Sequence, residues 1–488
     1  MKQGLWDANL QVIEKNQWPQ YYIGAYPYCF QIPEYKEAAW PPPPGGLRMG
    51  QSPGTHWYHA HKHGSTAINV ANGMTGVFII EGDYDDKINK FYGAGFKQQV
   101  MVINQLGVSP NLLRVPNPQG GPGPGSQDKG PDFSVNGRAQ PMVEMAQGEV
   151  QMWRIANTAG RSGAFFNPFP RGFDWIQTAQ DGVQLTYDNA VRKGNHTFLM
   201  AAGNRVDLLV KAPTIPGKYN ILVQHAVDPA DLGGSNPAIP VPLIQVSVTG
   251  TPAPGNLTKL IDKDSYPKQP AFLTNITDED VAGTLNNPRV IQFGTTGPNF
   301  PAQVGQAYGQ HTVNGQKFQD GQDTPIAVNL AAVEEWRIEN WTFGPPISHP
   351  FHIHINPFQI VEVFDPNAKV NDPKKGMLNK YIFDGSPLTN ADLQCPVNPQ
   401  DKGTWKDCHN DTSDTPRIWW DVFPIPSGTV QQNVQIPGFF RLRSRFVDFA
   451  GQYVLHCHIL AHEDRGMMAM VTVSAPDKKL DPTIFKHH

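Results

Sequence analysis

The chain has 488 residues, of which 46 are glycine and 46 are proline, and its 39 Lys and Arg residues nearly balance its 43 Asp and Glu residues. So much glycine and proline excludes a protein of long helices or coiled coils, because both residues break helices. The near-neutral charge, with no basic stripe, argues against a nucleic-acid partner, and the 39% hydrophobic residues exclude general disorder. The length corresponds to about three domains.

The amino-terminal segment begins MKQGLWD and contains no hydrophobic stretch typical of a signal peptide. No apolar run in the chain reaches the ~18 residues of a membrane helix, so we expect no membrane partner. On this evidence the protein is either cytoplasmic, or its true amino terminus is absent from the sequence.

Short strands follow in chain order, and they predict an all-β protein of three units. The first unit, 1–92, opens with forty-odd loop-like residues that include Pro41 to Pro44, and it closes with a strand at 77–80. The second unit, 96–249, has predicted strands at 99–103, 206–210, 219–223 and 243–248. Residues 250–285 are predicted as a linker, and the third unit spans 286–488.

A weak internal repeat relates the second and third units. Residues 134–141 read SVNGRAQP and are followed by the segment EVQMWRIAN, and residues 312–318 read TVNGQKF and are followed by EEWRIEN. Each copy predicts an Asn-Gly turn and then a strand that alternates Trp and Ile with polar residues. A spacing of about 180 residues is too long for a solenoid and indicates duplicated domains.

Four cysteines are few for a fold built on disulfides. Cys395 and Cys408 lie in a polar loop and either pair with each other or stay free, because spacing alone does not establish a disulfide. Cys29 is expected to be a buried lone residue. Cys457 differs from these three because it lies between two histidines.

Ten of the 16 histidines fall in three short clusters. A scattered histidine is usually a surface or core residue, but this clustering indicates metal ligands, because imidazole is a favoured ligand of copper, zinc and iron. The clusters are His56, His59, His61 and His63; His349, His352 and His354; and His456, His458 and His462.

Strand geometry divides these residues into two sites. Alternate residues of a strand face the same side, so His456 and His458 point one way and Cys457 points the other. By the same argument His352 and His354 share a face, as do His59 and His61, whereas His349 reaches the opposite face.

The first predicted site combines Cys457, His349 and His462 with Met467. A cysteine, two histidines and a methionine form the trigonal blue-copper set with a weak axial thioether. Zinc is the alternative metal, and a core methionine is the alternative role for Met467. The second site gathers six imidazoles from distant strands, which implies a polynuclear centre between two domains: His59, His61, His352, His354, His456 and His458.

Three motifs carry a family resemblance that covers essentially the whole chain. HPFHIH at 349–354 and HCHILAHEDRGM at 456–467 resemble the last two copper-binding motifs of the multicopper oxidases (laccases and relatives), and WYHAH at 57–61 resembles the second. The resemblance implies three cupredoxin-like Greek-key β-sandwich domains. It also implies a type 1 copper that takes single electrons from a reductant, and a trinuclear copper cluster that reduces dioxygen to water.

The resemblance assigns roles residue by residue. It implies the type 1 ligands His349, Cys457, His462 and axial Met467. It implies His352 as the type 2 ligand, and as type 3 ligands His59, His61, His354, His456 and His458. Glu463 matches a carboxylate that supplies protons near the cluster, which suits a reaction that consumes protons; an exposed acid with no catalytic role is the alternative.

One departure from the family concerns its first motif, H-x-H-G, which supplies one type 2 and one type 3 ligand. No such motif precedes His56, and the single H-x-H-G, at 61–64, directly follows the second motif. We therefore expect an amino-terminally truncated first domain, an intact type 1 site and an incomplete cluster, with a secreted or periplasmic full-length form. His56 or His63 substituting for the lost ligands is an alternative, as is a homo-oligomer or partner chain that completes the domain.

The expected function is a laccase-like oxidation of phenolic or similar organic reductants coupled to the reduction of dioxygen. The alternative is a type 1 copper electron-transfer or copper-binding protein with an inactive cluster. Substrates of the family dock beside the outer type 1 histidine, here His462 or His349, and the loop at 384–417 is a candidate pocket wall. Trp419 and Trp420 either line that pocket or belong to the core.

Overall fold

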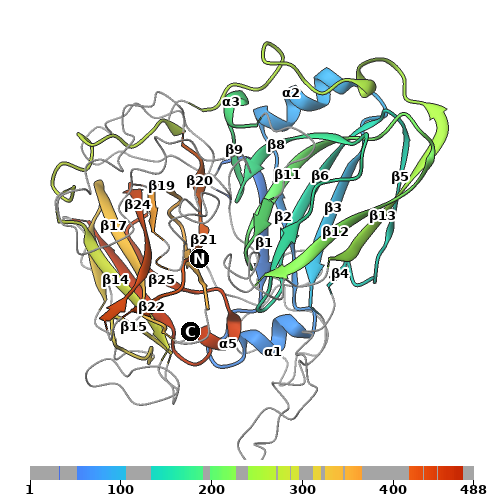
Figure 1. Cartoon of the computed structure of the whole chain (residues 1–488). Coiled ribbons are helices and arrows are strands. Elements are labelled where there is room, and N and C mark those ends of the chain that lie inside the picture. Colours follow the sequence, from blue (N-terminus) through green and yellow to red (C-terminus); the bar gives the residue numbers. More distant parts are fainter. Residues whose placement is uncertain are drawn as a thin grey trace, which may run out of the picture.

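The computed structural model describes residues 32, 52–105, 133–190, 198–226, 240–270, 273–285, 287–295, 311–319, 325–343, 347–364, 366, 417–431, 434–447 and 449–475. Two β-sandwiches stand side by side and dominate these residues (Figure 1), so the all-β prediction is confirmed. Cys29, Cys395, Cys408 and nearly all of the 384–417 loop lie outside the described residues. No helix in the described part is long and apolar enough to cross a membrane.

The first sandwich packs a five-stranded sheet, ordered β10-β7-β12-β13-β5, on a six-stranded sheet, ordered β4-β3-β6-β11-β8-β9. Its core contains Trp153 and Trp175, which are both fully buried. The strands are β3 (Gln98–Asn104), β4 (Ser134–Val135), β5 (Met142–Gln147), β6 (Val150–Asn157), β7 (Gly163–Phe166), β8 (Asp174–Gln180), β9 (Val183–Gln184), β10 (Phe198–Met200), β11 (Arg205–Lys211), β12 (Gly217–Ala226) and β13 (Val241–Pro252).

The second sandwich packs a six-stranded sheet, ordered β15-β14-β17-β24-β19-β20, on a five-stranded sheet, ordered β16-β26-β25-β18-β21. Trp336, Phe351 and Cys457 are buried in its core. Its strands are β14 (Arg289–Thr295), β15 (His311–Val313), β16 (Ile326–Asn329), β17 (Ala332–Asn340), β18 (His349–Ile353), β19 (Phe358–Phe364), β20 (Trp419–Trp420), β21 (Val422–Ile425), β24 (Gly438–Phe446), β25 (Gly451–Cys457) and β26 (Met468–Ser474), with a separate β22 (Thr429–Gln431) and β23 (Val434–Ile436) pair.

The internal repeat appears as two sheets of the same topology. β3 pairs in parallel with β6 and antiparallel with β4, and β14 pairs in the same way with β17 and β15. The predicted Asn-Gly turns are present in both copies, since Asn136 and Asn314 each have a φ of 51°. A left-handed conformation at both turn positions is the one that Asn-Gly favours.

The remaining elements surround the sandwiches. The hairpin of β1 (Gly54–His59) and β2 (Thr75–Ile80) lies against the first sandwich, where Thr55 Oγ1 donates to Asp207 Oδ1 over 2.5 Å and Arg205 Nε donates to the carbonyl of Thr55. The helices are α1 (Thr66–Ala71), α2 (Asp83–Tyr92), α3 (Tyr187–Ala190), the 3-10 helix η3 (Gly255–Thr258) and α5 (Leu460–Glu463).

The segment predicted as a linker is packed onto the cores. Leu257, Ile261 and Tyr266 are buried together with residues of α2, and Ile276 is buried beside Trp419. Burial of this apolar surface favours a fixed arrangement of the segment against both sandwiches.

Candidate metal centres

The strand β25 carries residues of two sites on its opposite faces. It pairs antiparallel with β18, so that His456 lies opposite His352 and Cys457 lies opposite Phe351. Side chains paired across two strands point to the same face, and neighbours along a strand point to opposite faces. The structure therefore places His456 and Cys457 on opposite faces of β25, as the sequence predicts.

The core-facing site brings together Cys457, His349 and His462. Nδ1 of His349 lies 3.5 Å from Sγ of Cys457, and Nδ1 of His462 lies 3.9 Å from it. The two Nδ1 atoms are 3.3 Å apart. Three donor atoms at these separations, with His349 and Cys457 fully buried, could hold one metal ion.

A short turn after β25 returns the chain to this site. The backbone N–H of His462 donates to Ile459, and that of Met467 donates to His462 over 2.9 Å. The N–H of Cys457 then donates to the carbonyl of Met467 over 3.0 Å. Met467 is fully buried in the same core cluster as Cys457. This position is consistent with either of its two predicted roles, copper ligand or core methionine.

Thr342 and His311 support the site, although sequence patterns did not reveal either residue. Oγ1 of Thr342 lies 2.8 Å from Nε2 of His349, and it also accepts the backbone N–H of Thr295. His311 forms a hydrogen bond with Thr295 Oγ1 over 3.0 Å and stacks on His462, with ring centroids 4.2 Å apart. One small network thus holds both histidines of the site.

The electrostatics of this site fit a cation. Burial lowers the pKa of His349 to about 3 and that of His462 well below its ordinary value, so both imidazoles are neutral donors. Burial also raises the pKa of the Cys457 thiol. A bound metal ion would supply the positive charge that a buried thiolate needs, and the mixture of sulfur and imidazole donors suits copper.

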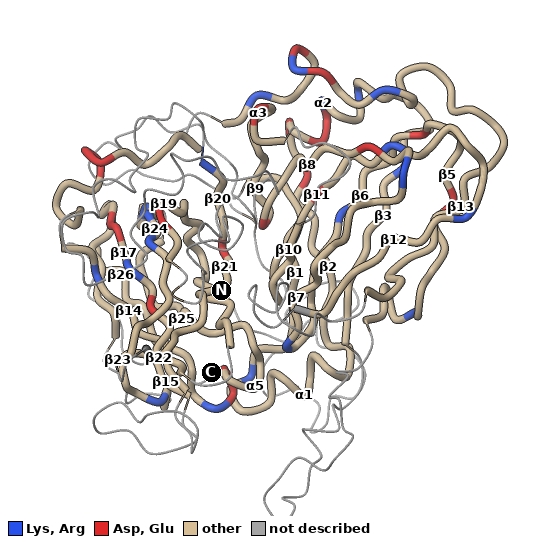
Figure 2. Tube along the Cα trace, viewed as in Figure 1, with Lys and Arg blue, Asp and Glu red and all other residues tan. Residues whose placement is uncertain are grey.

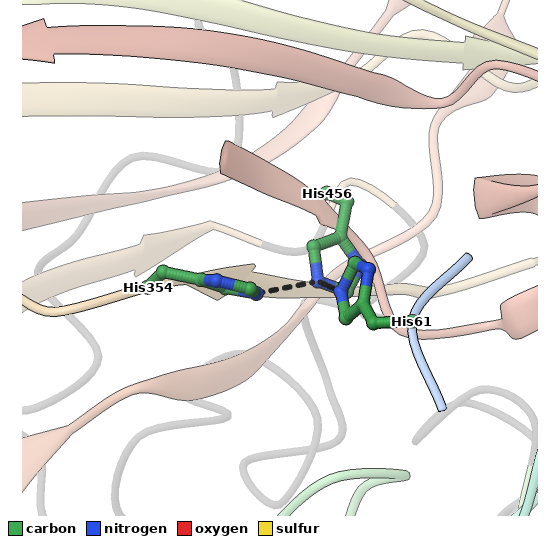
Figure 3. Close-up of side chains that lie close together, drawn as sticks. All are labelled: His61, His354 and His456. Atoms are coloured by element: carbon green, nitrogen blue, oxygen red, sulfur yellow. Dashed lines mark hydrogen bonds between the residues drawn. The ribbon is translucent and has the colours of Figure 1, made fainter. Parts of the chain in front are cut away.

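Six imidazoles form a cluster on the other face of β25. Nε2 of His456 lies 3.2 Å from Nε2 of His61 and 3.3 Å from Nε2 of His354 (Figure 3). His352, His59 and His458 complete the cluster, because the His352 and His458 ring centroids are 5.6 Å apart and those of His59 and His458 are 5.7 Å apart. The structure thus brings together all six residues predicted for the second site.

Oxygen atoms outside the cluster hold Nδ1 of four of these rings. The carbonyl of Ala60 lies 3.0 Å from Nδ1 of His59, and that of Asp421 lies 2.8 Å from Nδ1 of His352. A carboxylate lies near Nδ1 of both His61 and His456. Because a ring nitrogen that donates to oxygen leaves the other nitrogen as an acceptor, these contacts leave Nε2 available to a metal ion.

His458 gives the clearest indication that this cluster suits a ligand. Both of its ring nitrogens are buried, and neither has a hydrogen-bond partner among the described residues. Gly203, at a φ of +95°, lies against this ring so closely that an added Cβ would come within 2.8 Å of it. An unsatisfied buried polar group costs about 1–3 kcal/mol, a cost that a bound metal ion would remove.

Glu463 is buried on the cluster side of α5. Its Oε2 lies 3.0 Å from Nδ1 of His456, and its Oε1 lies 3.5 Å from Nδ1 of His61. Although burial raises the pKa of Glu463, the surrounding imidazoles, chiefly that of His456, hold it below the usual range. The alternative of an exposed acid at this position does not hold, because the side chain is fully buried.

The other residues singled out from the sequence lie elsewhere. His56 forms a hydrogen bond with the carbonyl of Ser52 and lies against Gly182. His63 packs its ring edge on Phe318. Neither belongs to the metal-binding groups identified within the described residues. Trp419 and Trp420 are core residues, since both are at most 4% exposed.

An ion pair that no sequence motif indicates also supports His352. Arg205 donates to both carboxylate oxygens of Asp421 over 2.6 Å, and it donates to the carbonyls of Gly203 and Asp181. Asp421 and Gly203 both lie against the imidazole cluster through His352 and His458. The guanidinium of Arg205 therefore connects the first sandwich to this cluster.

Comparisons with known proteins point in one direction. Residues 285–477 match a family model described as multicopper oxidase. The chain is 24% identical over 430 residues to a laccase of Bacillus subtilis, a match that covers 86% of this chain and 71% of the relative. It is 22% identical over 450 residues to a bilirubin oxidase of Albifimbria verrucaria, covering 89% of this chain and 63% of the relative.

Solved structures show the same fold. A multicopper oxidase from Campylobacter jejuni, described as a metallo-oxidase, aligns with a TM-score of 0.54 at 19% identity, over 86% of this chain and 72% of that chain. A multicopper oxidase from Aquifex aeolicus aligns with a TM-score of 0.55 at 19% identity, over 88% and 77%. The fold is that of cupredoxin-like β-sandwiches.

Proposed function

Because the chain belongs to the multicopper oxidase family, and is an oxidoreductase that uses oxygen, we propose that it oxidises phenolic or similar organic reductants by single electrons and reduces dioxygen to water. The observation that carries this proposal is the pair of donor sets on opposite faces of β25, joined by the tripeptide His456-Cys457-His458.

We assign the site residues as follows. His349, Cys457 and His462, together with Met467, would hold the type 1 copper. His352 is the type 2 ligand. The type 3 ligands are His59, His61, His354, His456 and His458. Copper held by the first set would supply a one-electron acceptor for the reductant, and copper held by the second set would supply the redox centre at which dioxygen is reduced.

The protein's own residues contribute three things to this reaction. The backbone of β25 provides a short covalent path from Cys457 to the imidazoles of His456 and His458. The core around Cys457 excludes water from the thiol, which is fully buried. Glu463 lies within 3.5 Å of two cluster histidines, where its carboxylate can accept a proton and pass it on to the oxygen site.

Oxygen uptake tests this function directly. Copper-loaded protein should consume dioxygen when a phenol or an organic dye is added, and the oxidised product should accumulate in proportion. If a panel of phenols and dyes produced no oxygen uptake by fully loaded protein, the proposal would be wrong.

A second candidate function is a type 1 copper electron-transfer protein. The specific observation in its favour is the compact donor set of His349, Cys457 and His462, whose ligand atoms all lie within 4.8 Å of one another and could hold one copper ion by themselves. Copper near one ion per chain, a strong blue band and no oxygen consumption would select this candidate. Absorption and EPR spectra that separate the copper types would distinguish the two functions.

We also propose, from the family, a secreted or periplasmic location.

A further inference from the structure

The side chain of His462 extends from the protein surface to the Cys457 site, so electrons can enter the site through it. His349 and Cys457 are buried, whereas His462 is half-buried. A reductant that donates electrons to this site therefore approaches the exposed edge of His462. This premise rests on the proposed function.

Three exposed cations lie on the segments next to His462, and we call Arg161, Lys317 and Arg465 the basic rim. Arg465 lies two residues after the end of α5, the helix that carries His462. Lys317 is held beside Gly466, because the N–H of Phe318 donates to the carbonyl of Gly466 and the Lys317 stem lies against its α-carbon.

Arg161 comes to the same place from the first sandwich. The neighbouring Gly160 accepts the backbone N–H of Leu460 over 2.9 Å, at the start of α5. The charges of Arg161 and Arg465 help to lower the pKa of His462, and those of Arg465 and Lys317 do the same for His311, as expected for cations close to these rings. Figure 2 shows Lys and Arg positions near α5 and β15.

The acids near His462 do not neutralise the basic rim. Glu463 is buried and faces the imidazole cluster. Asp464 accepts the backbone N–H groups of Thr66 and Ala67 with its two oxygens, over 2.9 and 2.8 Å. Within the described residues, none of the three rim cations forms a salt bridge.

We propose that the basic rim selects anionic aromatic reductants, such as phenols that carry a carboxylate or sulfonate group, over neutral and cationic reductants, metal cations included. Unpaired cations around an electron-entry edge attract an anion and orient its charged group toward the rim, with its ring toward His462. They repel a cation from the same edge. Such fields change association rates by about 10- to 1,000-fold at low salt.

The kinetic test uses three forms of one phenol. Syringate is anionic, its methyl ester is neutral and its choline ester is cationic, while the oxidisable ring stays the same. We expect wild-type protein to prefer the anion, and the triple variant Arg161→Gln, Lys317→Gln, Arg465→Gln to lower the ratio of kcat/KM for syringate over methyl ester roughly 5- to 10-fold. Added salt should lower the same ratio in wild type, because it screens exposed charges.

A matched control changes the net charge equally but far from the site. Lys87, Lys90 and Lys218 are exposed on α2 and β12, and replacing all three by glutamine should leave the ratio unchanged. The rim side chains are exposed, so the variants should fold; near-ultraviolet circular dichroism checks this, and the three single variants provide a second series.

A binding measurement separates this inference from the proposed function. Trimethoxybenzoate, a redox-inert analogue, should bind the copper-loaded protein more tightly than its methyl ester by calorimetry, and the rim variant should lose this preference. Equal preference in wild type and rim variant would overturn the inference even if oxygen uptake with neutral phenols were normal. Conversely, charge-selective binding without any oxygen uptake would support the proposed selectivity of the basic rim and contradict the proposed oxidase function.

Discussion

Oε2 of Glu463 lies 3.0 Å from Nδ1 of His456, the residue that directly precedes Cys457. The same carboxylate lies 3.5 Å from Nδ1 of His61. One acid thus contacts two imidazoles that approach each other through their Nε2 atoms. A group that holds two ligands in one tautomer influences both the copper content of the cluster and the delivery of protons.

Replacing Glu463 by glutamine keeps the shape of the side chain but removes its negative charge and its ability to accept and release a proton. We expect oxygen reduction to fall about 10- to 100-fold, as is typical when a partner of a metal ligand is lost. The blue band should persist, because the Cys457 site is on the other face of β25. Oxygen uptake and copper content measure the effect, and the exposed Glu81→Gln is the control. Unchanged turnover would remove Glu463 from the mechanism.

Cys457→Ser should abolish the blue colour, because the charge-transfer band of a blue copper centre requires sulfur. The copper of this site should be lost, while the imidazole cluster keeps its own ligands. The absorption spectrum and the copper content of the variant check the prediction. A retained blue band would show that another residue supplies the sulfur.

Met467→Leu should raise the reduction potential of the type 1 copper and leave the blue band in place, because the axial ligand tunes the potential. A redox titration followed at the blue band measures the change. Leucine has nearly the same volume, so the core should tolerate it. An unchanged potential would assign Met467 to the core alone.

Thr342→Val should weaken copper binding at the Cys457 site by roughly 10- to 100-fold, since the hydroxyl that fixes the tautomer of His349 is lost. Thr342→Ser retains the hydroxyl and should restore binding, which separates the hydrogen bond from the packing. Thr214→Val, at an exposed position, is the control. Competition with a copper chelator gives the affinities, and a valine variant with wild-type affinity would argue against this role.

Glu362 provides a prediction about pH and stability. Burial raises its pKa to about 7 against the opposing charge of Arg337. The folded state therefore keeps a proton that the unfolded chain releases above about pH 4.5, so wild-type stability falls as the pH rises from there through 7. Glu362→Gln should lack this loss and gain on the order of 1–3 kcal/mol relative to wild type between pH 5 and pH 8.

Unfolding in urea at the two pH values measures this difference. The exposed Glu81→Gln should show none of it. If the stability difference between Glu362→Gln and wild type were the same at both pH values, Glu362 would not titrate in this range.

The histidine sites could be predicted because their geometry is local. Alternation along a strand separates His456 from Cys457 whatever the rest of the chain does. The duplicated Asn-Gly turns could also be predicted from the sequence, since the two turn residues specify their own backbone conformation. These features depend on neighbours within a few positions of the chain.

The supporting residues could not be predicted because their contacts form only in the folded structure, even where two partners are close in sequence, as Thr342 and His349 are. Thr342 reaches His349 only after β17 and β18 are placed in the second sandwich, and Arg205 reaches Asp421 across 216 positions. His311 resembled any isolated histidine until β15 brought it onto His462. Single residues of common types carry no pattern, so tertiary structure alone reveals them.

The contact between His61 and His456 joins two parts of the chain that are 395 positions apart. A metal ion bound by both would act on stability as a disulfide does, by closing a very long loop. Loop closure of this size removes about 6 kcal/mol of conformational freedom from the unfolded chain in the chain-entropy description. The copper cluster would thus be a cross-link as well as a catalyst, and chelation would loosen the attachment of the hairpin β1–β2 to the second sandwich.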